Sequence, residues 1–299
     1  MNTDRHVRVT EVGPRDGLQN EGAIVSVEDK IRLVDALSPA GFPEIETSSF
    51  VSPKWVPQLA DAAEVFAGID RAEGTRYSAL VPNERGLERA MACGVDKLAV
   101  FTAASESFCD RNLNTTIAGS IERFIPVFEA ARRSSTPLRG YVSCVVRCPF
   151  EGDIDARGVA QAVRLLLDAT DGDIEISLGE TLGVAVPEDV ERVLEAMDGL
   201  VPIEELDVHL HDTNGRAVDC AARALELGVR RFDASCAGLG GCPYAPGAAG
   251  NLATEDLLGL LERDGWTTGV DLEKVGIAVG IAREITGRSA PGIGAVDVD

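Results

Sequence analysis

Residues 205–228 read ELDVHLHDTNGRAVDCAARALELG, and this stretch holds one complete strand and helix unit. The apolar run within 205–211 indicates a strand. Polar residues follow it, and Arg216 to Leu227 then has the apolar spacing of a helix that Gly228 closes. A strand that leads directly into such a helix is typical of a parallel α/β fold.

The same unit recurs along nearly the whole chain. We predict strands at 6–12, 43–49, 76–81, 97–103, 139–146, 173–178, 205–211 and 231–236. We predict helices at 26–37, 56–67, 84–93, 115–133, 155–169, 187–197, 216–227 and 254–263, with another from Leu272. Eight such units fit one (β/α)8 TIM barrel better than a doubly wound sheet. We therefore expect a single α/β domain over 1–299, with the C-terminal helices from about 254 packing on the barrel.

Composition excludes several classes of protein. The chain of 299 residues is 45% hydrophobic, enough for a large core, and its formal charge of −21 argues against a nucleic-acid partner. No apolar stretch approaches the ~18 to 20 residues that cross a bilayer, and residues 1–6 lack the apolar core of a signal peptide. We expect a cytoplasmic protein with no membrane partner.

The strongest local signal for a metal is His209-Leu210-His211 at the end of the seventh strand. Alternate residues of a strand face the same way, with side-chain origins roughly 6.5 to 7 Å apart, so both imidazoles can reach one cation. The alternative is a pair of core histidines, but two of the chain's 3 histidines occupy this one strand end. Asp16 and Asn251 can add oxygen ligands from adjacent strand ends. This mixed set suits Mg²⁺ or Mn²⁺ and leaves zinc, cobalt and iron open.

Other polar residues follow the same strand ends. Arg15, in the segment EVGPRDGLQNE (11–21), is a permanent cation that can stabilise a substrate oxyanion, and its alternative role is an ion pair with Glu46 or another nearby acid. Glu46 and Glu180 can orient Arg15 or a histidine. Cys242 stands in a glycine-rich loop that matches no phosphate-binding fingerprint, and its thiol can exchange a proton; the alternative is an incidental exposed cysteine.

These motifs resemble the hydroxymethylglutaryl-CoA lyase family. The resemblance is carried by EVGPRDGLQNE (11–21), IETSSFVSPKWVPQLAD (45–61), RGYVSC (139–144), HLHDTNG (209–215) and AGLGGCPYAPGAAGNLATEDL (237–257). It implies that the metal ligands are Asp16, His209, His211 and Asn251. It implies that the catalytic residues are Arg15, which stabilises an enolate, together with Asp16, Glu46, His209 and Cys242. The implied substrate contacts are Arg15, Gln19 and Glu180.

The resemblance implies a retro-Claisen cleavage of 3-hydroxy-3-methylglutaryl-CoA to acetyl-CoA and acetoacetate by a homo-oligomer, a dimer or tetramer. A lyase for citramalyl-CoA or a longer-branched 3-hydroxyglutaryl-CoA would share every catalytic residue. A condensing synthase is disfavoured by the 237–257 block, and a metal-dependent scaffold by the intact catalytic set. Three residues depart from the family pattern: Glu180 in place of aspartate, Gly22 in place of lysine, and Arg147 in place of a small residue. We expect Arg147 to be able to meet a CoA phosphate.

Overall fold

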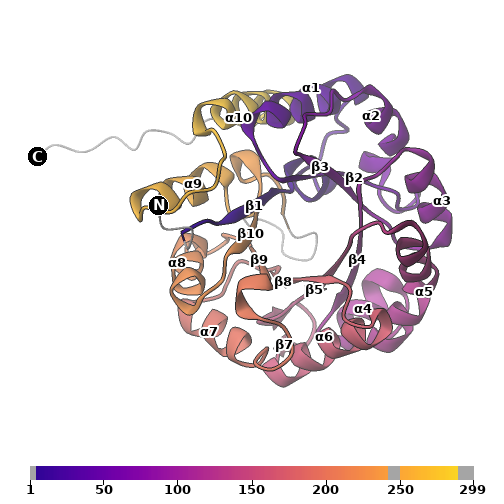
Figure 1. The fold of residues 1–299 in the computed structure, drawn as a ribbon, viewed down its shortest axis with the longest axis vertical. Coiled ribbons are helices and arrows are strands. Elements are labelled where there is room, and N and C mark those ends of the chain that lie inside the picture. The colour runs from indigo at the N-terminus through magenta and orange to yellow at the C-terminus, as the bar shows by residue number, and fades with distance from the viewer. Residues whose placement is uncertain (1–4, 242–249, 289–299) are drawn as a thin grey trace, which may run out of the picture.

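The computed structural model describes residues 5–241 and 250–288. Over these residues, eight parallel strands form one closed barrel with helices around it (Figure 1). Around the barrel the strand order is β1-β10-β9-β8-β5-β4-β3-β2, which confirms the predicted (β/α)8 fold. The barrel strands are β1 (Arg8–Glu11), β2 (Glu44–Ser49), β3 (Arg76–Leu80), β4 (Lys97–Ala103), β5 (Leu138–Ser143), β8 (Glu175–Glu180), β9 (Asp207–Leu210) and β10 (Arg231–Ala234).

The barrel closes where the first strand meets the last. Val9 of β1 lies opposite Phe232 of β10, and β10 pairs on its other side with β9. The carboxyl ends of β1, β9 and β10 therefore meet at one part of the rim. This neighbourhood is the one in which the sequence predicts a metal site.

Capping residues mark the start of α1 and the end of α8. The Ser26 hydroxyl accepts a hydrogen bond from the Asp29 N–H (3.1 Å) at the start of α1, and Gly228, with φ of 116°, ends α8. The helices are α1 (Val27–Leu37), α2 (Ala62–Gly68), α3 (Glu84–Ala92), α4 (Glu106–Leu113), α5 (Ile117–Ser134), α6 (Ala156–Thr170), α7 (Pro187–Glu195), α8 (Ala217–Leu227), α9 (Thr254–Arg263) and α10 (Leu272–Thr286). None of these described helices combines the length and apolarity of a bilayer-spanning segment.

Two parts of the chain differ from the sequence prediction. The predicted helix start at Val56 is wrong, because Pro57–Leu59 form a separate 3₁₀ turn and α2 begins only at Ala62. Helix α4 and a short antiparallel hairpin, β6 (Arg147–Cys148) with β7 (Gly152–Asp153), were not predicted. Both additions follow the carboxyl end of a barrel strand and therefore extend the same rim.

The C-terminal helices attach to the outside of the barrel. In Figure 1, α10 lies beside α1, and the Arg32 guanidinium bonds the Glu284 carboxylate across them (2.5 Å). The Lys274 ammonium also donates to the Pro39 carbonyl (3.1 Å). Helix α10 thereby brings Arg288 toward the rim where β1 and β10 end.

Buried charges fill the amino-terminal end of the barrel. Lys97, fully buried, contacts the carboxylates of Glu44 (2.8 Å) and Glu175. Arg139 bonds Asp233 (2.5 Å) and Asp207 (3.2 Å), and each of these side chains is almost completely shielded from solvent. Removing Arg139 would leave the two buried carboxylates of Asp207 and Asp233 without their shared cation, whereas removing one carboxylate leaves Arg139 with the other.

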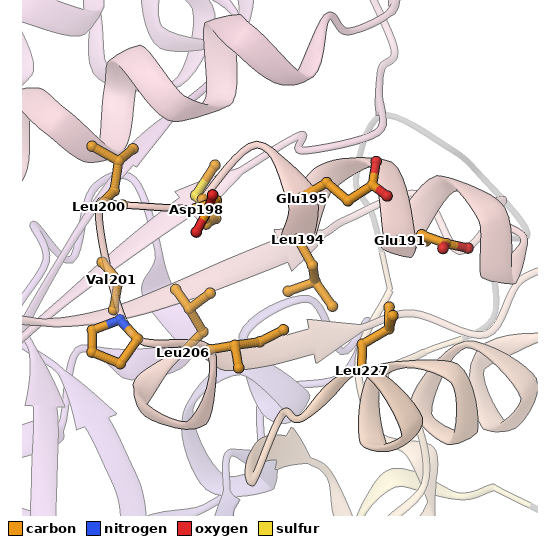
Figure 2. Close-up of a pocket in the computed structure, with 12 residues that line it drawn as sticks. Glu191, Leu194, Glu195, Asp198, Leu200, Val201, Leu206 and Leu227 are labelled. Carbon is orange, nitrogen blue, oxygen red and sulfur yellow. The ribbon is translucent and has the colours of Figure 1, made fainter.

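A cavity lies outside the barrel, away from the polar rim. It has a volume of about 550 Å³ and is lined by residues of α7, by the connection to β9 and by Leu227 at the end of α8. Figure 2 shows Leu194, Leu206 and Leu227 around it, with Glu191 and Glu195 along α7. Leu206 precedes β9, whereas the two histidines are at the strand's other end, so this cavity is separate from the predicted metal site.

Candidate metal centre and active site

Strand β9 presents two histidines at its carboxyl end. His209 lies in the strand and His211 follows it directly, with ring centroids 5.3 Å apart. Both rings are buried. Burial, together with the neighbouring His209, lowers the pKa of His211 to about 4. The His211 imidazole is therefore neutral near pH 7 and keeps a lone pair for a cation.

A single turn of π-helix after β1, Gly13–Gly17, carries the next two site residues. The N–H groups of Arg15, Asp16 and Gly17 all donate to the Val12 carbonyl, at 3.1, 2.8 and 3.1 Å. A Cβ on Gly17 would lie 2.7 Å from the Leu239 Cβ, so only glycine allows the turn to pack this closely on the segment after β10. This packing places Arg15 and Asp16 near the ends of β9 and β10.

Arg15 lies between two carboxylates. Its guanidinium donates to Asp16 Oδ1 (2.6 Å) and, through Nε, to Glu46 Oε2 (2.7 Å), and Nη2 makes an ion-pair contact with the same Glu46 oxygen (2.6 Å). Its Cζ also lies 5.3 Å from the centre of the Tyr141 ring. Burial would raise the pKa of Asp16, but Arg15 and the two histidines lower it below its usual value, so Asp16 is a carboxylate at neutral pH. Arg15 therefore forms an ion pair with Glu46, and its role toward an enolate stays a prediction.

Asn251 joins the cluster from the segment after the glycine-rich loop. Its backbone pairs with that of His211 in an isolated antiparallel bridge. Its amide nitrogen donates to Asp16 Oδ2 (3.0 Å) and to the Leu239 carbonyl (2.9 Å). The amide oxygen is buried and, over the described residues, accepts no hydrogen bond, as is also true of His211 Nδ1.

These side chains fit a divalent cation. One ligand atom from each of Asp16, His209 and His211 lies within 4.8 Å of the others. The Asn251 oxygen is a fourth possible ligand atom, and both it and His211 Nδ1 are buried without a hydrogen-bond partner among the described residues, a lack that a cation would satisfy. Two imidazoles with carboxylate and amide oxygens form a mixed nitrogen and oxygen set. The structure thus brings together all four residues that the sequence predicts as ligands.

A carboxylate that the sequence analysis missed orients one of the histidines. Asp233 of β10 lies 3.2 Å from His209 Nδ1, and Ser177 Oγ donates to the same Asp233 oxygen (3.0 Å). Burial would lower the pKa of His209, but the bond to Asp233 and the charge of Asp16 raise it. Asp233 fixes the proton on Nδ1 and leaves Nε2 facing Asp16 (3.8 Å). The available signal was an aspartate between the apolar residues Phe232 and Ala234.

Glu180 points elsewhere. Its carboxylate accepts from the N–H groups of Leu182 (3.4 Å), Gly183 (2.7 Å) and Val184 (3.4 Å). The side chain therefore holds the loop after β8 in place. Its predicted contact with substrate stays a prediction.

Four more predicted or unusual residues complete the comparison with the sequence. Gln19 lies half-buried just after the π-helical turn, and Gly22 is exposed. Arg147 bonds Asp153 (2.6 Å) within the β6–β7 hairpin, so its charge already has a partner. Cys242 lies outside the described residues, and its catalytic role stays a prediction.

Comparison with known proteins gives the family. The HMGL-like family model matches residues 6–278. The chain belongs to the HMGL-like family. This membership confirms the resemblance found in the motifs, and together with the Asp16, His209 and His211 cluster it indicates a divalent-metal site.

Relatives of this HMGL-like chain are similar over most of their length. The 3-hydroxy-3-isohexenylglutaryl-CoA/hydroxy-methylglutaryl-CoA lyase of Pseudomonas aeruginosa is 53% identical over 272 residues, 91% of this chain and 90% of the relative. The HMG-CoA lyase structure from Brucella melitensis has a TM-score of 0.92 at 48% identity, over 94% of this chain and 99% of that one. An Acinetobacter baumannii HMG-CoA lyase in complex with coenzyme A and 3-methylmalate has a TM-score of 0.92 at 37% identity, covering 100% and 99%.

Proposed function

We propose that this protein is a hydroxymethylglutaryl-CoA lyase, which cleaves 3-hydroxy-3-methylglutaryl-CoA to acetyl-CoA and acetoacetate. The observation that carries the proposal is the convergence of Arg15, Asp16, His209, His211 and Asn251 at one rim of the barrel. The reaction removes the proton of a tertiary alcohol and breaks the bond between C2 and C3. The bonding electrons pass to the thioester enolate, and the alcohol carbon becomes the ketone of acetoacetate.

We propose Mg²⁺ or Mn²⁺ as the cation, held by Asp16, His209, His211 and Asn251. Such an ion supplies Lewis acidity and a fixed position for substrate oxygens. A mixed nitrogen and oxygen set without a thiolate favours these ions over thiolate-preferring metals. The buried site also excludes water from the charges that develop during the reaction.

Arg15 is proposed to bind the enolate oxygen. Its guanidinium is fixed before substrate arrives, because Glu46 receives two of its nitrogens and the Tyr141 ring lies beside it. A donor that needs no reorganisation at the moment of bond cleavage stabilises developing negative charge most effectively. Glu46 acts in this scheme through Arg15.

Two proton transfers complete the reaction. Asp16 or His209 accepts the proton of the alcohol, and their side chains already face one another across 3.8 Å. Cys242 is proposed to give a proton to the acetyl carbon, on the basis of its place in the sequence. Cys242→Ser should then depress turnover severely while Mn²⁺ affinity stays unchanged, and near-normal turnover would remove the thiol from the mechanism.

The substrate class is proposed to be a CoA thioester, with Gln19 and Glu180 as candidate contacts to it. The Acinetobacter baumannii relative crystallised with coenzyme A supports this class. A second candidate substrate is a longer-branched 3-hydroxyglutaryl-CoA, because the name of the Pseudomonas aeruginosa relative includes an isohexenyl form. A lyase for citramalyl-CoA is the remaining lyase alternative, and a condensing synthase is disfavoured by the 237–257 block.

One assay separates these functions. Purified protein with Mn²⁺ or Mg²⁺ is offered 3-hydroxy-3-methylglutaryl-CoA, its isohexenyl analogue, citramalyl-CoA, or acetyl-CoA with a 2-oxoacid, and the products are identified. Acetoacetate from the first substrate supports the proposal. Products only from citramalyl-CoA or only from the 2-oxoacid would contradict it.

The organisation of the protein is also a proposal. We propose that 1–299 form one catalytic domain, with the helices from Thr254 onward as part of it. Attachment of α10 to α1 through Arg32 and Glu284 supports this view. Assembly into a dimer or tetramer and a cytoplasmic location stay predictions.

A further inference from the structure

Arg288, just after α10, contacts two segments that are far away in the sequence. Its guanidinium donates to the carbonyls of Gly238 (3.1 Å) and Gly240 (3.0 Å), and it bonds the Glu21 carboxylate (2.6 Å). Glu21 ends the EVGPRDGLQNE segment that carries Arg15 and Asp16. One side chain therefore ties the end of α10 to both loops of the candidate metal centre.

The 237–240 turn that Arg288 holds has an unusual backbone. Ala237, Gly238 and Gly240 have φ values of 57°, 58° and 124°, which fall in the left-handed region. Alanine rarely adopts this conformation, so contacts from outside must stabilise the turn. A guanidinium suits this task, because its planar fork can bond two outward-facing carbonyls at once.

The carbonyl between those two belongs to Leu239, and it accepts from Asn251. The Asn251 amide nitrogen donates to it at 2.9 Å, and the Asn251 backbone N–H at 3.4 Å. A Cβ on Gly240 would lie 2.5 Å from the Asn251 amide nitrogen, so the turn packs directly on this side chain. Because the nitrogen is held by Leu239 and Asp16, the orientation of the turn decides where the Asn251 oxygen points.

We infer that Arg288 is a positioning residue for the metal centre, acting on Asn251 through the Gly238–Gly240 turn. The inference rests on the proposed role of Asn251 as a ligand. Glu21 holds Arg288 in place by an ion pair in which the carboxylate is only 12% exposed. In this arrangement the end of α10 sets the geometry of a ligand that it does not touch.

The test measures metal binding without substrate. Mn²⁺ is titrated into metal-stripped full-length protein, and the free ion is followed by electron paramagnetic resonance. For Arg288→Met we expect the dissociation constant to rise about tenfold, the lower end of the range for changes outside the ligand shell, together with an altered spectrum of bound Mn²⁺. Arg288→Lys should recover part of this loss, since an ammonium can still bond one or two of the three oxygens. Amide exchange at 238–241 and 250–252 should become faster in Arg288→Met.

Two further variants separate positioning from general loosening of α10. Arg32→Met removes the ion pair that joins α10 to α1, at a guanidinium 44% exposed, and should leave Mn²⁺ affinity unchanged. Glu21→Gln should weaken Mn²⁺ binding less than Arg288→Met. The double variant should match Arg288→Met, because the two residues act through one contact.

Each outcome bears on one claim. Unchanged Mn²⁺ affinity and spectrum in a folded Arg288→Met, or equal losses in Arg32→Met, would overturn the inference while leaving the proposed lyase reaction intact. If the wild-type protein binds no Mn²⁺, the proposed metal centre itself fails. If Arg288→Met does not fold, Arg288→Lys serves as the test. Mn²⁺ affinity and amide exchange rates equal to those of the wild type in Arg288→Lys would then contradict the positioning role of Arg288.

Discussion

Arg15 directs two of its nitrogens, Nε and Nη2, at a single oxygen of Glu46, at 2.7 and 2.6 Å. The Tyr141 hydroxyl donates to that same oxygen (3.1 Å), while the second Glu46 oxygen is buried without a partner among the described residues. Two hydrogen bonds and the Nη2 ion-pair contact on one carboxylate oxygen fix the direction of the guanidinium. Nη1 contacts Asp16, so Arg15 is positioned between its support and the metal centre.

Glu46→Gln should lower turnover about 10- to 100-fold, since it removes charged hydrogen bonds worth roughly 1.5–3 kcal/mol. Tyr141→Phe removes one neutral bond to the same oxygen, so its effect should be only a few-fold. Steady-state kinetics of both variants test this order. Equal losses in the two would show that the charge of Glu46 does not act through Arg15.

Arg15→Met should reduce kcat by about 10² to 10³, the usual loss when one oxyanion donor is removed. Mn²⁺ should bind at least as tightly as in the wild type, because Arg15 no longer competes for Asp16. Kinetics and a metal titration on the same preparation provide both values. If Arg15→Met also lost Mn²⁺ binding, Arg15 would be needed to maintain the structure of the site, and the loss of turnover would not show that it binds the enolate.

Asp233→Asn should weaken Mn²⁺ binding about tenfold, because a neutral amide holds the His209 ring less firmly than a carboxylate does. Arg139 keeps Asp207 as a partner, so the variant should still fold. Ser177→Ala, which removes one bond to Asp233, is the milder control. Wild-type affinity in Asp233→Asn would contradict the role of this carboxylate.

Glu180→Gln should lower the free energy of unfolding by about 1–3 kcal/mol, since an amide cannot accept from all three N–H groups of the following loop. Mn²⁺ affinity should stay within about twofold, consistent with a side chain that faces the backbone. Denaturant titration and metal binding are measured together. A loss of Mn²⁺ affinity at unchanged stability would instead point to direct involvement of Glu180 in the site.

Glu11 should make stability depend on pH. Burial raises its pKa to about 7, although the bonds from Thr254 and from the Cys236 and Gly13 N–H groups oppose that shift. The folded state thus holds the proton more tightly than the unfolded chain, whose carboxyl titrates near 4.5. The stabilisation is complete below pH 4.5 and is lost as pH rises to 7, a change of about 3 kcal/mol.

Glu11→Gln stays neutral at every pH, and the Thr254 hydroxyl can accept from its amide. The difference in free energy of unfolding between wild type and variant, measured at pH 5 and pH 8, isolates the effect of Glu11. We expect the wild type to lose stability relative to the variant over this interval. If the difference in free energy of unfolding were the same at pH 5 and pH 8, Glu11 would have the same pKa in the folded and unfolded states, contrary to the prediction.

The strand pattern was predictable because buried parallel strands are apolar runs bounded by polar residues. All eight predicted strands overlap observed ones. The π-helical turn was not predictable, since it depends on Gly13 and Gly17 packing against residues more than 200 positions away. The β6–β7 hairpin is too short to leave a periodic pattern.

The site was predictable where polar residues leave strand ends, as Arg15, Asp16 and His211 do. Asp233 and Arg139 were missed because their partners lie on different strands, and no local spacing records such pairs. Glu180 shows the opposite difficulty. A carboxylate at a strand end has the same sequence signal whether it faces substrate or the following backbone.

The four proposed ligands come from distant parts of the chain, and this determines when the proposed metal centre can form. Asp16 follows the first strand, whereas His209, His211 and Asn251 arrive with the last third of the sequence. They meet only once β1 has paired with β10, so a nascent or C-terminally truncated chain has no complete set. Binding of a cation at this site would therefore show that the β-barrel has closed during folding. An ion bound at this seam would resist its reopening, with a stabilisation that grows with the logarithm of metal concentration.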